Sequence, residues 1–174
     1  MKKTLSILLA VTLLSAACKT GDPREKSLKE ISQTQQEVFS KDFEVALEKK
    51  QQLMDLYLAF VKDFPQDSLA PEFLFSCADV AIRSQQEMYA ITLYQRIYDE
   101  YPDHLLRPLA LMYQAWIYDN YLGDADHAKP LYKQFLVMFP DDPNVFIVEQ
   151  LLEMVDKSPE EMELLMQQFE NQEE

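Results

Sequence analysis

The residues that could carry out chemistry are few, and their spacing does not assemble a reaction centre. The histidines, His104 and His127, have no second imidazole three or four residues away and no cysteine pair beside them, so no zinc site is expected. Cys77 lies in an apolar run, which favours a buried, inert thiol over a redox or intermolecular role. We therefore expect no metal and no cofactor.

Acidic side chains cluster only where helices are expected to begin. The run Asp124-Ala125-Asp126 superficially resembles a calcium loop but lacks the central glycine and the later ligands, so helix capping explains it better. Asp141-Asp142 and Glu160-Glu161 lie at predicted helix N-termini, where the dipole favours negative charge. Acid–base catalysis needs a desolvated carboxylate in a pocket, and no pattern indicates one. The sequence predicts no enzymatic activity and no small-molecule substrate.

The elements that position these residues follow from a motif that occurs three times. Each copy ends in an aromatic residue and a proline, and these prolines, Pro65, Pro102 and Pro140, are 37 and 38 residues apart. Apolar residues lie one, four, five, nine and twelve positions before each proline, which is the spacing of one helix face. A tyrosine lies eight positions before each proline: Tyr57, Tyr94 and Tyr132. Each copy therefore predicts an amphipathic helix that stops at the proline.

A second helix precedes the tyrosine helix in the last two copies. Pro71 and Pro108 follow the preceding stop by six residues and suit a first helical turn, and Ala78 and Ala115 recur thirteen residues after it. One such pair cannot cover its own apolar face, whereas stacked pairs can, so we predict an all-α solenoid of helix hairpins. The expected helices are 71–83, 85–101, 108–122 and 126–139.

Further helices are expected at both ends of this single domain, residues 27–172. At the N-terminal end we predict a helix over 27–39 and a long one over 43–64, so the first repeat is expected to lack a separate first helix and to act as a cap. At the C-terminal end we predict helices over 143–155 and 159–169, the latter opened by the capping box Ser158-Pro159-Glu160-Glu161.

At these positions the chain resembles the tetratricopeptide repeat family, over about residues 42–156. Four positions of the family pattern match in two copies each. The small residue of the first helix is Ala78 and Ala115, and the alanine early in the second helix is Ala90 and Ala128. The aromatic residue of the second helix is Tyr94 and Tyr132, and the closing proline is Pro102 and Pro140. The pattern is more closely similar to bacterial envelope lipoproteins of outer-membrane β-barrel assembly and of Tol–Pal-associated division coordination. The resemblance implies antiparallel hairpins that bind protein segments.

The N-terminus reads as an export signal. Residues 1–17 have a basic start, a short apolar core and small residues before Cys18, as in a secretory signal peptide. They also resemble the bacterial lipobox, which implies that Cys18 carries a lipid at the start of the mature chain, followed by a polar tether, residues 18–26. Lys19 is not the aspartate of an inner-membrane retention signal, so we expect an outer-membrane lipoprotein facing the periplasm. Ordinary cleavage after Ala17, leaving a soluble periplasmic protein, is the alternative.

The charge balance limits the possible partners. Removal of the signal takes away Lys2 and Lys3 and no acidic residue, so the formal net charge falls from −14 to −16. Nucleic acids and anionic lipid surfaces bind proteins through basic patches, so neither is an expected partner of this acidic chain. Membrane attachment should therefore come only from a lipid on Cys18. The excess of acid is either solvated helix surface or part of a groove for a basic peptide.

The resemblance implies a concave face lined by the first helix of each hairpin. It places one aromatic-rich set of residues there: Phe75, Asp79, Ile82, Arg83, Met112, Trp116, Asp119 and Asn120. Apolar anchors with a polar rim suit a helix- or peptide-binding groove. In the alternative, the helices that begin at Pro143 and Pro159 fold over this face and bury Trp116.

The sequence therefore predicts a lipid-anchored periplasmic adaptor that binds protein segments of an envelope assembly, at the outer membrane or peptidoglycan, and catalyses nothing. The alternative is a structural, oligomeric spacer lipoprotein without an open peptide groove.

Overall fold

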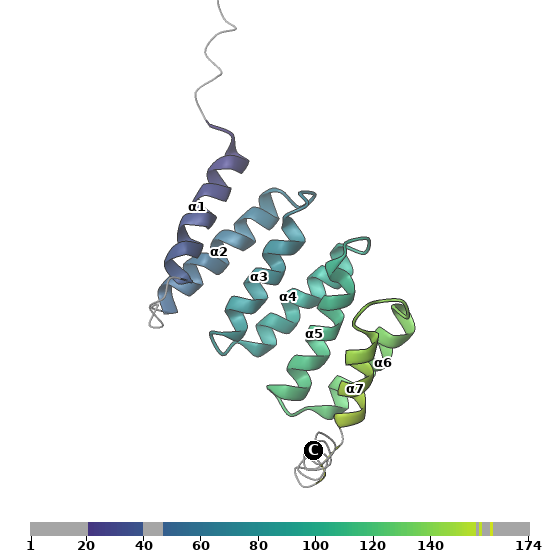
Figure 1. Cartoon of the computed structure of the whole chain (residues 1–174). Coiled ribbons are helices and arrows are strands. Elements are labelled where there is room, and N and C mark those ends of the chain that lie inside the picture. Colours follow the sequence, from purple (N-terminus) through teal and green to yellow (C-terminus); the bar gives the residue numbers. More distant parts are fainter. Residues whose placement is uncertain (1–20, 40–46, 156, 158–160, 162–174) are drawn as a thin grey trace, which may run out of the picture.

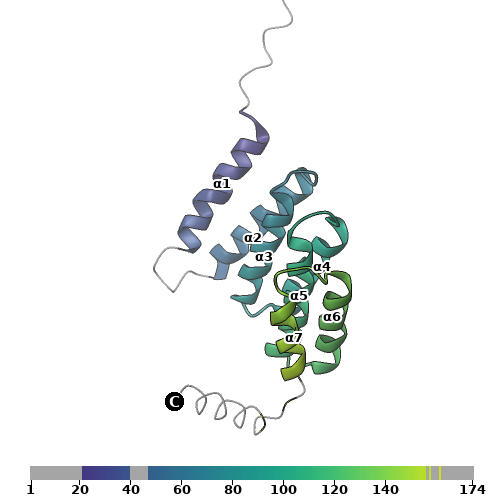
Figure 2. The ribbon, with the colours of Figure 1, turned by 45° about the vertical axis from the view of Figure 1, so that its right-hand side comes forward.

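A computed structural model describes residues 21–39, 47–155, 157 and 161 of the chain. All regular structure in these residues is helical, and each helix packs against the next one in the chain (Figures 1 and 2). The helices are α1 Pro23–Val38, α2 Leu47–Asp63, α3 Ala70–Ile82, α4 Glu87–Glu100, α5 Leu106–Asn120, α6 Ala125–Met138 and α7 Val145–Met154. The fold is an all-α, tetratricopeptide-like solenoid of antiparallel hairpins, as predicted.

The predicted bounds of α3 to α7 agree with the structure to within two residues. Residues 1–17, Cys18 and the predicted helix 159–169 lie outside the described residues. Proline marks the helix starts in two hairpins, since Pro71 is the second residue of α3 and Pro108 the third of α5. Pro130 is the sixth residue of α6, so the helix lacks the N–H that would bond to the Asp126 carbonyl.

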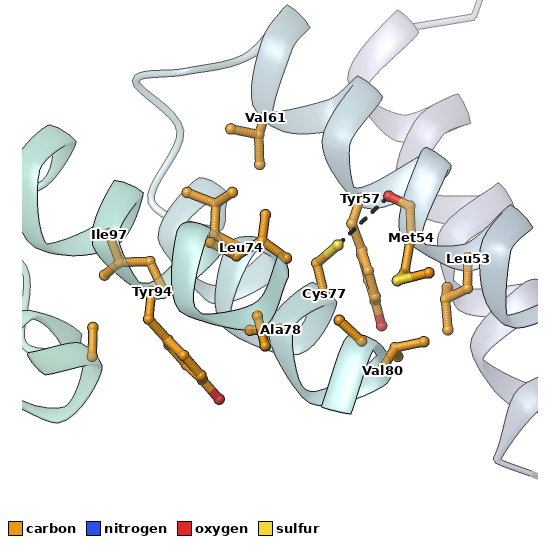
Figure 3. Close-up of a cluster of buried hydrophobic side chains, with 14 of the residues drawn as sticks. Leu53, Met54, Tyr57, Val61, Leu74, Cys77, Ala78, Val80, Tyr94 and Ile97 are labelled. Carbon is orange, nitrogen blue, oxygen red and sulfur yellow. Dashed lines mark hydrogen bonds between the residues drawn. The ribbon is translucent and has the colours of Figure 1, made fainter. Parts of the chain in front are cut away.

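The three repeated tyrosines occupy matching positions in the stack. Tyr57, Tyr94 and Tyr132 have none of their surface exposed, and each belongs to the second helix of a hairpin. Each tyrosine hydroxyl is hydrogen-bonded to a polar side chain of the first helix of the same hairpin. Figure 3 shows Tyr57 and Tyr94 on either side of Leu74 and Ala78, with both rings directed to the same side. The threefold motif is thus a structural repeat, as the sequence predicts.

The partner of each hydroxyl comes from the first helix of the same hairpin, although the partners do not share one repeat position. Gln35 Nε2 of α1 donates to the Tyr57 hydroxyl at 2.8 Å. The Tyr94 hydroxyl donates to Asp79 Oδ1 of α3 at 2.9 Å. The Tyr132 hydroxyl donates to Asp119 Oδ2 of α5 at 3.4 Å. A buried phenol hydroxyl without a hydrogen-bond partner would be unfavourable. These bonds therefore stabilise the buried ring and link the two helices of each hairpin.

The N-terminal end differs from the expectation drawn from the sequence. The first repeat does not lack a first helix: α1 packs against α2 and supplies Gln35 where α3 and α5 supply aspartates. Helix α1 also begins at Pro23 rather than at Ser27, because the Asp22 carboxylate caps it by accepting from the Arg24 N–H at 3.0 Å. Part of the predicted tether is therefore helical.

Candidate functional site

The predicted groove residues come from two helices that lie side by side although α4 separates them in the chain. Helices α3 and α5 contact each other directly. Helix α3 carries Phe75, Asp79 and Ile82, and Arg83 follows it directly. Helix α5 carries the other four: Met112, Trp116, Asp119 and Asn120. Both groups therefore belong to first helices of successive hairpins, as the predicted concave face requires.

An aromatic row links the two helices. The Phe75 ring lies edge-on to Tyr113 at 5.4 Å between centroids, and Tyr113 lies edge-on to Trp116 at 5.8 Å. Trp116 in turn meets Tyr121, at 5.2 Å, just beyond the end of α5. The core residue Tyr94 stacks on Tyr113 at 5.4 Å, which ties the row to the repeated junction. We call Phe75, Tyr113, Trp116 and Tyr121 the aromatic row.

The aromatic row includes two residues that sequence reasoning missed. Tyr113 and Tyr121 each follow a predicted groove residue, Met112 and Asn120, by one position. Met112 instead packs with the second core cluster, which includes residues of α6 and α7. Positions 113, 116 and 121 are all aromatic in the sequence. The family offsets selected Trp116, but they selected Met112 and Asn120 in place of the tyrosines that follow them.

The row is partly open to solvent. Phe75 and Trp116 are half-buried against the core, Tyr121 is 46% exposed, and the polar side chains of Arg83 and Asn120 are exposed. Helix α7, which begins close to Pro143, packs against α6 and leaves Trp116 half-buried. Apolar anchors with an exposed polar rim are what a peptide-binding surface needs.

Two carboxylates lie beside this row. Burial raises the pKa of Asp79 above its usual value, although the Tyr94 hydroxyl bond and Arg83 oppose that shift. Burial also raises the pKa of Asp119, against the bond from Tyr132. Burial and the adjacent carboxylates raise the pKa of both tyrosines, so the phenols remain donors. The two aspartates are acceptors that the repeated tyrosines hold in place.

The other candidates for chemistry have local structural roles. Burial raises the pKa of the Cys77 thiol to about 12, and its Sγ donates to the Met54 carbonyl at 3.9 Å, so the thiol is inert as predicted. Asp124 caps α6 by accepting from the His127 N–H at 3.1 Å, which confirms the capping interpretation. His104 Nδ1 accepts from the Leu106 N–H at 3.2 Å, in the turn before α5. In the described part of the chain, no group of side chains could hold a metal ion.

Comparison with known proteins identifies one part of the stack. A tetratricopeptide repeat model matches residues 109–142, which span most of α5 and all of α6. A search of curated proteins finds no match. Tetratricopeptide repeats generally bind protein partners and act as non-catalytic scaffolds. Among the residues that the structure covers, no helix is long and apolar enough to cross a membrane.

The half-buried carboxyl of Asp79 predicts a pH-dependent effect. Because its folded-state pKa is raised, protonation favours folding, and this contribution is lost as the pH rises through the folded pKa. Asp79→Asn keeps an acceptor for Tyr94 and removes the ionisation. We expect the unfolding free energy of the variant, relative to wild type, to be highest at neutral pH and to shrink as the pH falls toward the unfolded value of about 3.9.

Urea denaturation followed by circular dichroism at a series of pH values measures this difference. Asp119→Asn is a second test, because its carboxyl also accepts from a repeated tyrosine and burial raises its pKa in the same direction. Both variants should show the same sign. If the difference in unfolding free energy between variant and wild type grew as the pH fell, this would contradict the raised folded-state pKa of Asp79.

Proposed function

We propose that the protein is a lipid-anchored periplasmic adaptor that binds protein segments in a bacterial cell-envelope assembly. The observation that carries this proposal is the half-exposed aromatic row across α3 and α5, on a solenoid that contains a tetratricopeptide repeat. The signal-like residues 1–17 followed by Cys18 support the lipid anchor. The resemblance to envelope lipoproteins supports the outer-membrane or peptidoglycan setting.

The row and its rim define what kind of segment would fit. Aromatic rings supply large rigid contact area, so Phe75 and Trp116 would hold the apolar side chains of an amphipathic peptide. The remaining lone pairs of Asp79 and Asp119 would accept from its polar groups. Because the chain without residues 1–17 has a formal net charge of −16, a basic segment would be attracted and an acidic one repelled.

A spacer built from self-associating copies is the second candidate, and one feature favours it. The last described helix leaves large apolar side chains uncovered, with Phe146 69% exposed and Ile147 50% exposed. The end of α6 adds Val137, which is 78% exposed. Exposed apolar surface of this kind favours contact with another surface, including a second copy of the chain.

Site-specific photo-crosslinking in cells separates these two functions. A crosslinker at Asn120, which is exposed beside Trp116, should capture a discrete protein other than this one. The control crosslinker at Lys133 is exposed on α6, away from the aromatic row, and should not capture that protein. Trp116→Ala should weaken the Asn120 crosslink. If Asn120 captures only copies of this protein, or nothing, the spacer is the better account.

Intact-mass spectrometry of the membrane fraction tests the anchor. We expect a chain that begins at Cys18 and carries a mass increment from acyl groups. Several acyl chains are needed for stable attachment, since one holds a protein only marginally. Cys18→Ser should abolish the increment and release the protein from membranes. A chain that begins at an unmodified Cys18 would support ordinary cleavage after Ala17 instead.

A further inference from the structure

The C-terminal end of α5 carries a negative charge that no cation in the described part of the chain offsets. Asp119 lies in the last turn of α5, where the helix dipole favours positive charge, and that turn has no basic side chain. The sequence has no lysine or arginine between Arg107 and Lys129. Arg107 lies at the other end of α5, with its guanidinium 4.5 Å from the centre of the Tyr98 ring.

The end of α3 shows what the end of α5 lacks. Burial raises the pKa of Asp79, and Arg83, which follows α3 directly, opposes this rise. Burial also raises the pKa of Asp119, but no cationic side chain among the described residues opposes it there. The residue four positions after Asp119 is Gly123, where α3 has its arginine. One half-buried carboxylate thus has an arginine from its own chain, and the other has none.

One oxygen of the Asp119 carboxylate is available to a partner. Its Oδ2 accepts from the Tyr132 hydroxyl at 3.4 Å and from Asn120 Nδ2 at 3.5 Å. Its Oδ1 bonds to none of the described residues and is not buried. Trp116 precedes Asp119 by three residues, so the two side chains are neighbours on one face of α5. A donor that reaches Oδ1 therefore lies beside the indole ring.

An arginine side chain suits this combination better than a lysine does. Its guanidinium is planar and can stack on an aromatic ring while it donates to a carboxylate, whereas an ammonium group is compact and strongly hydrated. Exposed Tyr121, which meets Trp116, extends the aromatic surface beside the carboxylate. A cation at this place also complements the negative end of the helix dipole.

Charge and surface area select among the possible sources of this cation. Residues 158–174 contain glutamates but no lysine or arginine, so the chain's own C-terminal segment cannot supply it. A second copy without residues 1–17 would bring a formal net charge of −16, which opposes self-association at an acidic face. The aromatic row extends from Phe75 on α3 to Tyr121 beyond α5, which is more surface than one free arginine covers. A segment of a different protein meets all three conditions.

We propose that an arginine of a partner segment anchors at the end of α5, with its guanidinium on the Trp116 ring and one N–H donated to Asp119 Oδ1. A neighbouring apolar residue of the segment would lie against Phe75 and Tyr113. This inference rests on the proposed adaptor function, because it uses the same aromatic row, and it names the residue type that the row selects.

Fluorescence of the purified protein tests the anchor, because Trp116 is the only tryptophan in the sequence. The probe is the peptide acetyl-Leu-Arg-Ser-Leu-amide, and the matched control has citrulline in place of arginine, which keeps the shape and removes the charge. The arginine peptide should change the Trp116 emission in a saturable way and bind at least about tenfold more tightly than the citrulline peptide. Equal affinities, or no saturable change with the arginine peptide, would overturn the proposal.

Two variants locate the contact. Asp119→Asn keeps an acceptor for Tyr132 and removes the charge, so the arginine peptide should lose at least about tenfold in affinity while the citrulline peptide changes by less than about twofold. Asp99→Asn removes the same charge from an exposed residue near the end of α4, which lies at the start of the antiparallel α5. At physiological salt it should change either affinity by less than about twofold. Equal losses in the two variants would mean that only net charge matters, which overturns the anchor.

The outcomes separate this inference from the adaptor function. If both peptides bind equally well, the row still binds apolar segments and only the arginine anchor falls. If the arginine peptide binds as expected but the crosslinker at Asn120 captures no other protein in cells, the anchor stands and the adaptor function falls.

Two further measurements identify other sources of the cation. If dilution of the protein without peptide changes the Trp116 emission, and Asp119→Asn removes that change, a second copy supplies the arginine. If acetyl-arginine amide binds as tightly as the peptide, the site selects a free guanidinium compound. Either result overturns the partner segment.

Discussion

Each helix that the structure describes has an apolar side that its neighbours in the stack cover, and a buried tyrosine lies where the two helices of each of three hairpins meet. Tyr57, Tyr94 and Tyr132 are large enough to fill the space between successive helices. Each ring also brings a hydroxyl into the interior, and a buried hydroxyl needs a partner. Side chains of the preceding first helix provide it.

This arrangement links stability to the candidate binding face. Asp79 and Asp119 accept from core tyrosines, yet they lie on the same helices as Phe75 and Trp116. Tyr94 joins the two features, because it bonds to Asp79 and stacks on Tyr113 in the aromatic row. Core tyrosines therefore hold the two carboxylates beside the aromatic row in position. A segment that binds there meets acceptors and rings that are already in position, which reduces the ordering cost of association.

The repeat made much of the fold predictable. Proline and tyrosine offsets define α3 to α6 closely, because both residue types act through local geometry and helix periodicity. The role of α1 was not predictable in this way, since it lacks the family's alanine offsets and partners Tyr57 through Gln35 rather than an aspartate. A cavity of about 490 Å³ is lined by residues of α4, α5 and α6, and the residue spacing within any one helix could not predict it. Sequence offsets likewise selected Met112 where the packed structure uses Tyr113.

The most direct measurement is the unfolding free energy of Tyr57→Phe, Tyr94→Phe and Tyr132→Phe, obtained from urea denaturation. Each variant keeps the ring and removes only the hydroxyl. If these hydroxyl bonds hold the two helices of each hairpin together, each variant should lose about 1–3 kcal/mol. The loss should be largest for Tyr94, which bonds to the half-buried Asp79 carboxylate at 2.9 Å, and smaller for Tyr132, whose bond is 3.4 Å. Three variants within about 0.5 kcal/mol of wild type, as for ordinary surface substitutions, would contradict the account.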